Sequence, residues 1–170
     1  MILYRGSNMK VTNIDLSRCR PYKDFGQGFY LTDIREQAEQ MARRVARLYG
    51  GSPWVSAFIF DEAALARSDL KSLSFENPNK DWALFVLNNR NKRFKDTGDT
   101  LCNQDNKYDI VFGPVANDDI AYLFRTFTRG LICIDALVRG LEYKSLTTQY
   151  SFHTEESLRY LHPDGGLSDG

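Results

Sequence analysis

The sequence predicts one α+β domain. Its 170 residues fall within the range of a single compact domain, and 42% of them are hydrophobic. Short aromatic or β-branched runs, which predict strands, are interspersed with longer stretches whose apolar residues recur at helical spacing. No internal repeat or low-complexity block interrupts the chain. We therefore expect one domain over residues 1–161 and a frayed, glycine-rich tail over residues 162–170.

The N-terminal part of the chain predicts two strands and a helix. Met1–Tyr4 is an apolar strand, and the Gly-Ser-Asn cluster that follows predicts a turn, with Arg5 at the end of the strand. Phe29–Thr32 is a second strand, because its residues are aromatic or β-branched in character. Asp33–Tyr49 is an amphipathic helix by the period of its apolar residues. Its first residue and Glu36 match a capping box.

The same two patterns predict the remaining elements. The expected strands are Trp54–Phe60, Leu70–Phe75, Tyr108–Phe112 and Leu146–His153. The expected helices are Asn79–Arg90, Ile120–Phe127, Leu131–Tyr143 and a short one from Thr154 to Leu161. Gly113-Pro114 should halt the strand before it. Asn91–Asn106 is long and polar, so we expect a mobile loop there.

The composition excludes several classes of protein. Lys+Arg and Asp+Glu both number 22, so bulk attraction to nucleic acid or to an anionic membrane is not indicated. The three cysteines lack a C-x-x-C spacing, and only two histidines are present, so we expect neither a disulfide framework nor a metal site. The N-terminus shows no signal peptide and the chain no membrane span, which predicts a cytoplasmic location.

The stretch Asp24–Thr32 places two glycines directly before an aromatic strand. Paired glycines indicate a tight turn or a close approach of the backbone to another group. One interpretation is a hairpin turn followed by a buried Tyr30. The other is a site where backbone N–H groups and the tyrosine ring meet a flat ligand that carries an amide. The nearby basic residues Arg18, Arg20 and Lys23 are either solvated or face an anionic ligand.

Other candidate residues also have two interpretations. Arg5 is a surface charge or a ligand of phosphate, for which its planar fork is suited. Arg90, at the end of a predicted helix, caps the last carbonyls or points into a cleft. Asp118 lies where a helix N-cap is expected. The sequence contains no G-x-S-x-G, no phosphate-binding G-x-x-x-x-G-K-[ST] and no H-E-x-x-H motif.

Two segments together resemble the paired signature of the ADP-ribosyltransferase superfamily. They are Leu3–Ser7 (Leu-Tyr-Arg-Gly-Ser) and Phe25–Thr32 (Phe-Gly-Gln-Gly-Phe-Tyr-Leu-Thr). Members similar to poly-ADP-ribose polymerases and diphtheria toxin carry a strand ending in His-Gly-Ser and then a G-x-G-[IVF]-Y-[FL]-[AST] segment. From Ile2 to Leu161 the chain is also similar to a family of bacterial domains of unknown function assigned to that superfamily. The further matching segments are Asp81–Arg90, Tyr108–Asp118 and Gln149–Thr154.

The resemblance implies a pair of split, strongly bent antiparallel sheets with flanking helices and with NAD, as co-substrate, in the cleft between them. It implies that the Gly6 backbone pairs with the nicotinamide carboxamide, with Ser7 beside it. Tyr30 would stack on the nicotinamide ring, and Arg5 would hold the pyrophosphate or a ribose. The expected NAD-binding residues are Arg5, Gly6, Ser7, Gly28, Tyr30, Thr32 and Arg90.

The sequence departs from the superfamily pattern at its catalytic glutamate. Gln149 stands in the matching position, and an amide can hydrogen-bond a ribose hydroxyl but cannot supply negative charge or act as a base. Asp118 and its neighbour Asp119 are the leading substitute acids. Arg5, Tyr30, Gln149 and Asp118 thus form the expected catalytic set, although Gln149 is alternatively a structural strand residue.

The resemblance implies a mono-ADP-ribosyltransferase, acting as a toxin or defence effector on an unidentified protein or nucleic-acid acceptor. Family members encoded beside a small neutralising protein suggest an antitoxin-like partner. The alternatives are an NAD glycohydrolase and a catalytically silent domain that binds NAD, ADP-ribose or a nucleic acid.

Overall fold

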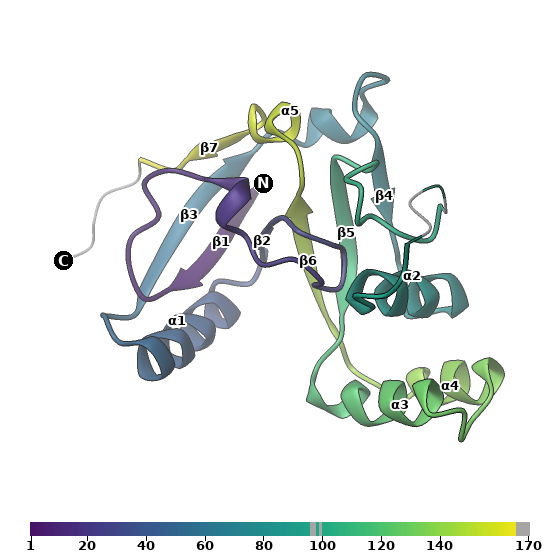
Figure 1. Ribbon diagram of the computed structural model, residues 1–170. Coiled ribbons are helices and arrows are strands. Elements are labelled where there is room, and N and C mark those ends of the chain that lie inside the picture. Colours follow the sequence, from purple (N-terminus) through teal and green to yellow (C-terminus); the bar gives the residue numbers. More distant parts are fainter. Residues whose placement is uncertain (96–97, 99, 166–170) are drawn as a thin grey trace.

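The computed structural model describes residues 1–95, 98 and 100–165. Within these residues the protein is a mixed α/β structure with two β-sheets and five α-helices (Figure 1). None of the helices in the described part of the chain has the length and apolar character needed to cross a membrane.

The first sheet has three antiparallel strands in the order β1-β3-β7. These strands are β1 (Ile2–Ser7), β3 (Trp54–Phe60) and β7 (Leu161–Pro163). Helix α1 (Arg35–Tyr49) packs across β1 and β3. A Cβ on Gly6 would lie 1.9 Å from the backbone oxygen of Ala38, so α1 can approach β1 this closely only because position 6 has no side chain.

The second sheet has four strands in the order β2-β6-β5-β4. They are β2 (Phe29–Leu31), β6 (Thr147–Phe152), β5 (Ile110–Val115) and β4 (Ser72–Ser74). The pairs are antiparallel except β4 with β5, so this sheet is mixed and not purely antiparallel as expected. The helices grouped on this side in Figure 1 are α2 (Lys80–Arg90), α3 (Asp118–Thr128) and α4 (Ile134–Leu141).

Three short helices complete the fold. They are α5 (Glu155–Leu158) and two 3₁₀ turns, Leu16–Arg18 and Glu62–Ala66. Thr154 caps α5 in a capping box with Ser157. The two glycines of the sequence pattern lie in an irregular segment that leads directly into β2.

The four-stranded sheet has a hydrophobic core on each face. Tyr150 and Phe152 of β6 belong to a core shared with the three-stranded sheet. Tyr30 and Val111 belong to a second core beneath α2, α3 and α4. Strand residues alternate between faces, so Ser151, which is opposite Tyr30, lies on the side of the second core.

The two sheets meet at one backbone bridge. Tyr4 N donates to Thr32 O at 2.7 Å, and Thr32 N donates to Tyr4 O at 3.0 Å. No other residue pair between β1 and β2 forms a bridge in the described part of the chain, so the sheets separate on either side of this contact. We call the region where β1 and β2 diverge the seam.

Two predicted strand ends are wrong for identifiable reasons. β1 continues through Arg5, Gly6 and Ser7 because these residues pair fully with β3, whereas a turn was expected. β5 continues through Gly113-Pro114, which was expected to end it. Pro114 is tolerated because β4 pairs with β5 only as far as Phe112, so no strand needs the missing N–H on that edge.

The predicted capping box at Asp33 is also wrong. The N-cap of α1 is Ile34, which makes no side-chain capping bond, and Thr32 Oγ1 accepts from the Ile34 N–H at 3.2 Å. The expected tail begins later than predicted, because His162 and Pro163 pair with β3 in β7. Residues 166–170 lie outside the described residues.

The expected mobile loop over residues 91–106 is anchored in its second half. Asn103 is fully buried, its N–H donates to Asn89 Oδ1 at 2.8 Å, and its side chain donates to Phe25 O at 3.2 Å. Gln104 Nε2 donates to Asn88 O at 2.8 Å. These polar side chains therefore satisfy backbone groups of α2 and of the glycine-containing segment. Residues 96, 97 and 99 lie outside the described residues.

Candidate functional site

The segment Asp24–Gly28, which we call the glycine turn, wraps around the hydroxyl of Tyr30. The Tyr30 Oη donates to Gly26 O at 2.7 Å and accepts from Phe25 N at 3.0 Å. The tyrosine is 5% exposed, and burial raises the pKa of its hydroxyl well above the usual value. The hydroxyl therefore remains protonated and acts as a structural donor.

Asp24 fixes one end of the glycine turn. Its Oδ1 lies 2.6 Å from the guanidinium of Arg90, and its Oδ2 accepts from Ala116 N at 2.6 Å. Asp24 is buried, and both of its oxygens are occupied. This carboxylate therefore joins the turn to the end of α2 and to the connection between β5 and α3.

His153 fixes the other end of the turn. Its Nδ1 lies 2.8 Å from Gln27 O and its Nε2 lies 2.8 Å from Ser151 Oγ. A carbonyl only accepts, so we assign the proton to Nδ1. Burial lowers the pKa of His153 to about 4, so the ring is neutral. A Cβ on Gly28 would lie 2.6 Å from Nδ1, and the glycine is needed for this packing.

Two cations lie against β2 at the seam. Arg5 Nη1 donates to Tyr30 O at 2.9 Å, and its Cζ lies 4.6 Å from the centroid of the Phe29 ring. Lys23 Nζ lies 4.1 Å from the centroid of the Tyr30 ring. In the described part of the chain neither cation forms an ion pair with a carboxylate. Asp24 attracts Lys23, but its oxygens are already held by Arg90 and Ala116.

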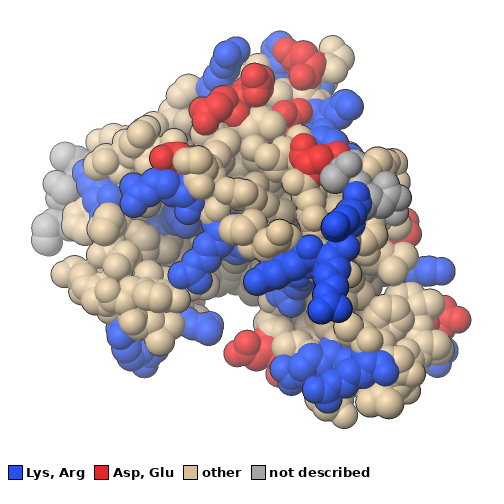
Figure 2. Space-filling view, viewed as in Figure 1, with Lys and Arg blue, Asp and Glu red and all other residues tan. Residues whose placement is uncertain are grey.

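The surroundings lower the pKa values of both Lys23 and Arg5. Desolvation by the surrounding protein, with added repulsion from Arg5, lowers the pKa of Lys23 to about 8, although the residue remains open to solvent. Desolvation also lowers the pKa of Arg5. Figure 2 shows Lys and Arg side chains around the hollow between the parts of the molecule that carry α1 and α3. An anion bound by both Arg5 and Lys23 would relieve the repulsion between them.

The structure brings four of the predicted site residues together at the seam: Arg5, Tyr30, Thr32 and Gln149. Arg5 is bonded to the backbone of Tyr30, and Thr32 forms the bridge to β1. Gln149 pairs with Gly113 and lies two residues from Ser151, which is opposite Tyr30. Gln149 and Tyr30 are therefore diagonal neighbours on one face of the sheet.

Other predicted residues are held by local contacts. Gly6 lies beneath α1, as described above, and Gly28 packs against His153. Ser7 Oγ donates to Met9 O. The Thr32 hydroxyl also donates to Gln37 Oε1 at 3.0 Å. These contacts account for the residue types without a ligand, so they add nothing specific to NAD.

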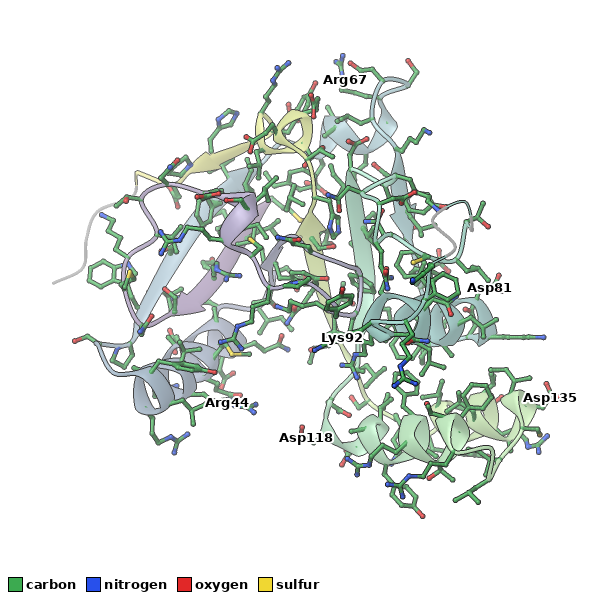
Figure 3. All side chains as sticks on the ribbon, in the orientation of Figure 1. Arg44, Arg67, Asp81, Lys92, Asp118 and Asp135 are labelled. Carbon is green, nitrogen blue, oxygen red and sulfur yellow. The ribbon has the colours of Figure 1, made fainter. Side chains whose placement is uncertain are left out.

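Arg90 and Asp118 are not part of the group at the seam. Arg90 is paired with Asp24. Asp118 is the first residue of α3 and is exposed, while the N-cap role falls to Asn117, whose side chain accepts from Ile120 N. Figure 3 shows Arg44 of α1 and Asp118 of α3 on the two sides of the space between these helices.

Three residues of the site were not among the expected site residues, and of these His153 was expected to be a structural histidine with satisfied hydrogen bonds, as observed. Lys23 belonged to the basic cluster before the turn, but only the fold shows that it covers the ring of Tyr30. A flat ligand reaches this face of the ring only if the Lys23 side chain moves aside. Asp24 and His153 hold the turn through partners that lie 66 and 126 residues away in the chain, and no local pattern indicates such pairs.

The comparisons with known proteins identify a family. The family model described as "Protein of unknown function (DUF3990)" matches residues 1–162, and the chain belongs to this family. No match was found among curated proteins or among solved structures.

Proposed function

We propose that the protein binds NAD at the seam and acts as a mono-ADP-ribosyltransferase, which transfers one ADP-ribose unit from NAD to a macromolecular acceptor. The observation that carries the proposal is the contact between the two resembling segments: the guanidinium of Arg5 in the first donates a hydrogen bond to the backbone carbonyl of Tyr30 in the second. We further propose that the two sheets correspond to the split sheets of ADP-ribosyltransferases, with NAD between them.

Arg5 and Lys23 fit the charge of the ligand. The pyrophosphate of NAD carries two negative charges, and these two cations have no carboxylate partner among the described residues. The nicotinamide ring of NAD is itself a cation, which favours the face of an aromatic ring. Lys23 occupies such a position over Tyr30. When NAD binds, the Lys23 ammonium would move from the face of the Tyr30 ring to the pyrophosphate, and the nicotinamide would then stack on that ring.

The reaction breaks the bond between ribose C1′ and the nicotinamide nitrogen. Nicotinamide leaves with the bonding electron pair, a nucleophile of the acceptor forms the new bond to C1′, and the nucleophile gives up its proton. Since nicotinamide is a good leaving group, positioning and charge stabilisation are the main tasks of the protein. Gln149 would accept a hydrogen bond from a ribose hydroxyl. Asp118 is exposed and lies outside the group at the seam, so we propose it as the proton acceptor only for an acceptor molecule that extends from the seam to the start of α3.

One observation favours a second function, the binding of NAD or ADP-ribose without turnover. Gln149 stands at the position of the superfamily glutamate. Asp24 is the carboxylate that interacts electrostatically with both Lys23 and Tyr30, but its two oxygens are already bound to Arg90 and Ala116 N. Loss of an ionic contact to the transition state costs orders of magnitude in rate.

An assay with NAD labelled in its adenosine half separates these functions. The pure protein is incubated with labelled NAD and with protein, RNA and DNA fractions, and free nicotinamide and labelled macromolecules are measured. Nicotinamide together with a labelled polymer supports transfer. Nicotinamide alone indicates hydrolysis, and thermal stabilisation by NAD without nicotinamide release indicates a binding module. Absence of both binding and release contradicts the proposal.

Three variants test the assignment of the residues. Arg5→Ala should abolish the stabilisation by NAD, and Asp118→Ala should abolish nicotinamide release while leaving the melting temperature unchanged. The Tyr30 hydroxyl holds the glycine turn, so Tyr30→Phe, which keeps the ring, should lower the melting temperature but retain the stabilisation by NAD. Normal activity of the Asp118 variant would exclude this residue as the acid.

A further inference from the structure

A concave surface lies between α2 and α3. Its volume is about 630 Å³. Its apolar lining comes from Leu84, Leu87, Ala121, Phe124 and Phe127. The polar side chains that line it are Asn88, Arg90, Asn91, Arg125, Thr128 and Arg129. We call this surface the α2–α3 groove.

The charge of the groove has one sign. Among the residues that the structure describes, three arginines line the groove and no carboxylate does. Arg90 is neutralised by Asp24, whereas Arg125 and Arg129 are exposed and form no ion pair with any described residue. The carboxylates of the two helices, Asp81, Asp118 and Asp119, all stand in first turns. Figure 2 shows Lys and Arg side chains gathered over α3.

The apolar lining of the groove selects between two kinds of acidic partner. A nucleic-acid strand needs a row of cations along its backbone and aromatic faces on which its bases stack. Here Leu84, Leu87 and Ala121 are aliphatic, and Phe124 is only 5% exposed, so little aromatic surface is open for stacking. A groove of this kind between two helices is suited to the apolar side of a third helix. The arginines at its rim then match carboxylates on the flanks of that helix.

We propose that the α2–α3 groove binds an amphipathic helix of a partner protein, with an apolar stripe and acidic flanks. Its apolar residues, spaced three and four apart, pack against Leu84, Leu87 and Phe127. Its carboxylates pair with Arg125 and Arg129. This inference does not depend on NAD binding or on catalysis at the seam.

Arg90 connects the groove to the glycine turn. It lines the groove, and its guanidinium lies 2.6 Å from Asp24 in the turn. A carboxylate of the bound helix that approaches Arg90 would compete with Asp24. The partner could thereby loosen the turn that holds Tyr30. Arg90 itself is unsuitable as a test position, because its replacement removes the partner of a buried carboxylate.

The test selects binders from a display library of helical peptides of about 18 residues, or about five turns. The immobilised protein is wild type, and the sequences of the enriched peptides are determined. Their affinities are then measured by fluorescence polarisation for the wild type and for Arg125→Glu/Arg129→Glu. Arg139→Glu, an exposed arginine on the neighbouring α4, is the matched control.

We expect enriched peptides with net negative charge and apolar residues at helical spacing. Their affinity should fall about tenfold or more in the double variant and stay unchanged in the control. Bound peptide should slow amide hydrogen exchange in residues 84–91 and 121–129. Failure to enrich peptides, enrichment of basic peptides, or equal affinity of the peptides for the wild type and the double variant would overturn the proposal. Binding of single-stranded RNA or DNA that is lost in the double variant would also overturn it.

Discussion

Two arginines contact the segment that carries the glycine turn and β2, but only one of them forms an ion pair with a carboxylate of the described residues. Arg90 meets a buried carboxylate, Asp24, at 2.6 Å. Arg5 meets only the carbonyl of Tyr30 and the face of the Phe29 ring, and Lys23 adds a second cation nearby. The first arrangement neutralises its charge within the protein. The second leaves positive charge in a partly desolvated place.

This difference separates a structural role from a binding role. An ion pair that is satisfied on both sides fixes the chain but offers nothing to a ligand. Unpaired cations that repel each other raise the free energy of the folded protein unless an anion joins them. The comparison therefore predicts that Asp24 and Arg90 serve stability, whereas Arg5 and Lys23 serve anion binding at some expense of stability.

The largest expected effect follows from breaking the paired arrangement. Asp24→Asn removes the charge that balances Arg90 and replaces a charged acceptor for Ala116 N. Loss of one partner of a buried pair costs 3–5 kcal/mol, and because the Arg90 side chain is 38% exposed, we expect a loss of about 3 kcal/mol in the free energy of unfolding. Urea denaturation measures it.

The exposed pair between Arg67 and Asp69, at 2.7 Å, provides the control. Both of its side chains are largely in solvent, where such pairs contribute little. Asp69→Asn should therefore leave the denaturation midpoint unchanged. Equal midpoints for Asp24→Asn and the wild type would show that the ion pair does not hold the glycine turn.

The opposite anchor of the turn predicts a dependence of stability on pH. The pKa of His153 is about 4 in the folded protein and near 6.5 when unfolded, so between these values the unfolded chain binds the extra proton. Stability is then retained above pH 6.5 and lost as the pH falls toward 4. From these two pKa values the expected loss between pH 7 and pH 5 is about 2 kcal/mol.

His153→Gln should remove most of this pH dependence, because the glutamine amide does not titrate. The protein has only one other histidine, His162, which is exposed. His162→Gln should therefore keep the slope of the wild type. The free energy of unfolding is compared at pH 5 and pH 7 for all three proteins, and an unaltered slope in His153→Gln would assign the effect to other groups.

Replacement of the unpaired cations should affect stability much less than binding. Arg5→Met and Lys23→Met each lose a cation–ring contact, and Arg5→Met also loses the hydrogen bond to Tyr30 O, but both relieve repulsion, so we expect changes within about 2 kcal/mol of the wild-type free energy of unfolding. Stabilisation by ADP-ribose, which reaches about 2.7 kcal/mol at a hundred times the dissociation constant, should disappear in both variants. Thermal denaturation with and without ADP-ribose measures this, with Arg43→Met of α1 as the control. If either variant destabilised the protein strongly and still bound ADP-ribose, the replaced cation would have a structural role and not a binding role.

The sequence was sufficient to predict most elements of the fold. Apolar periodicity located α1, α2 and α3, and β-branched or aromatic runs located β3 and β6, because these patterns are local. The errors occurred where tertiary contacts override local signals. The glycine and proline that should have ended β5 are accommodated because the neighbouring strand stops first. Polar residues expected in a mobile loop instead satisfy buried backbone groups, as Asn103 does.

The candidate site was predictable in part, for the same physical reason. The resemblance implied that Arg5 and Tyr30 lie close together, and the Arg5 guanidinium does contact the Tyr30 backbone carbonyl, while the Tyr30 ring is buried, as in the first interpretation of the paired glycines. The partners of Asp24 and His153 could not be predicted, since ion pairs and hydrogen bonds between distant segments leave no pattern in either one. Nor could the sequence indicate that Lys23 covers the ring, which depends on the path of the turn.

The smallest expected effect concerns the charge state of Lys23. Its pKa of about 8 means that the ammonium loses its proton at mildly alkaline pH, while the pyrophosphate of ADP-ribose keeps its charge. If the ligand requires the ammonium, its affinity should fall about eightfold from pH 7.5 to pH 9, in proportion to the protonated fraction. Lys23→Arg, whose guanidinium stays charged over this range, should bind with an affinity independent of pH. Isothermal titration calorimetry at several pH values measures this affinity. An affinity of the wild type that does not change with pH would mean that Lys23 does not contact the phosphates. Arg5 would then be the only unpaired cation of this pair with a binding role, in contrast to the ion-paired Arg90.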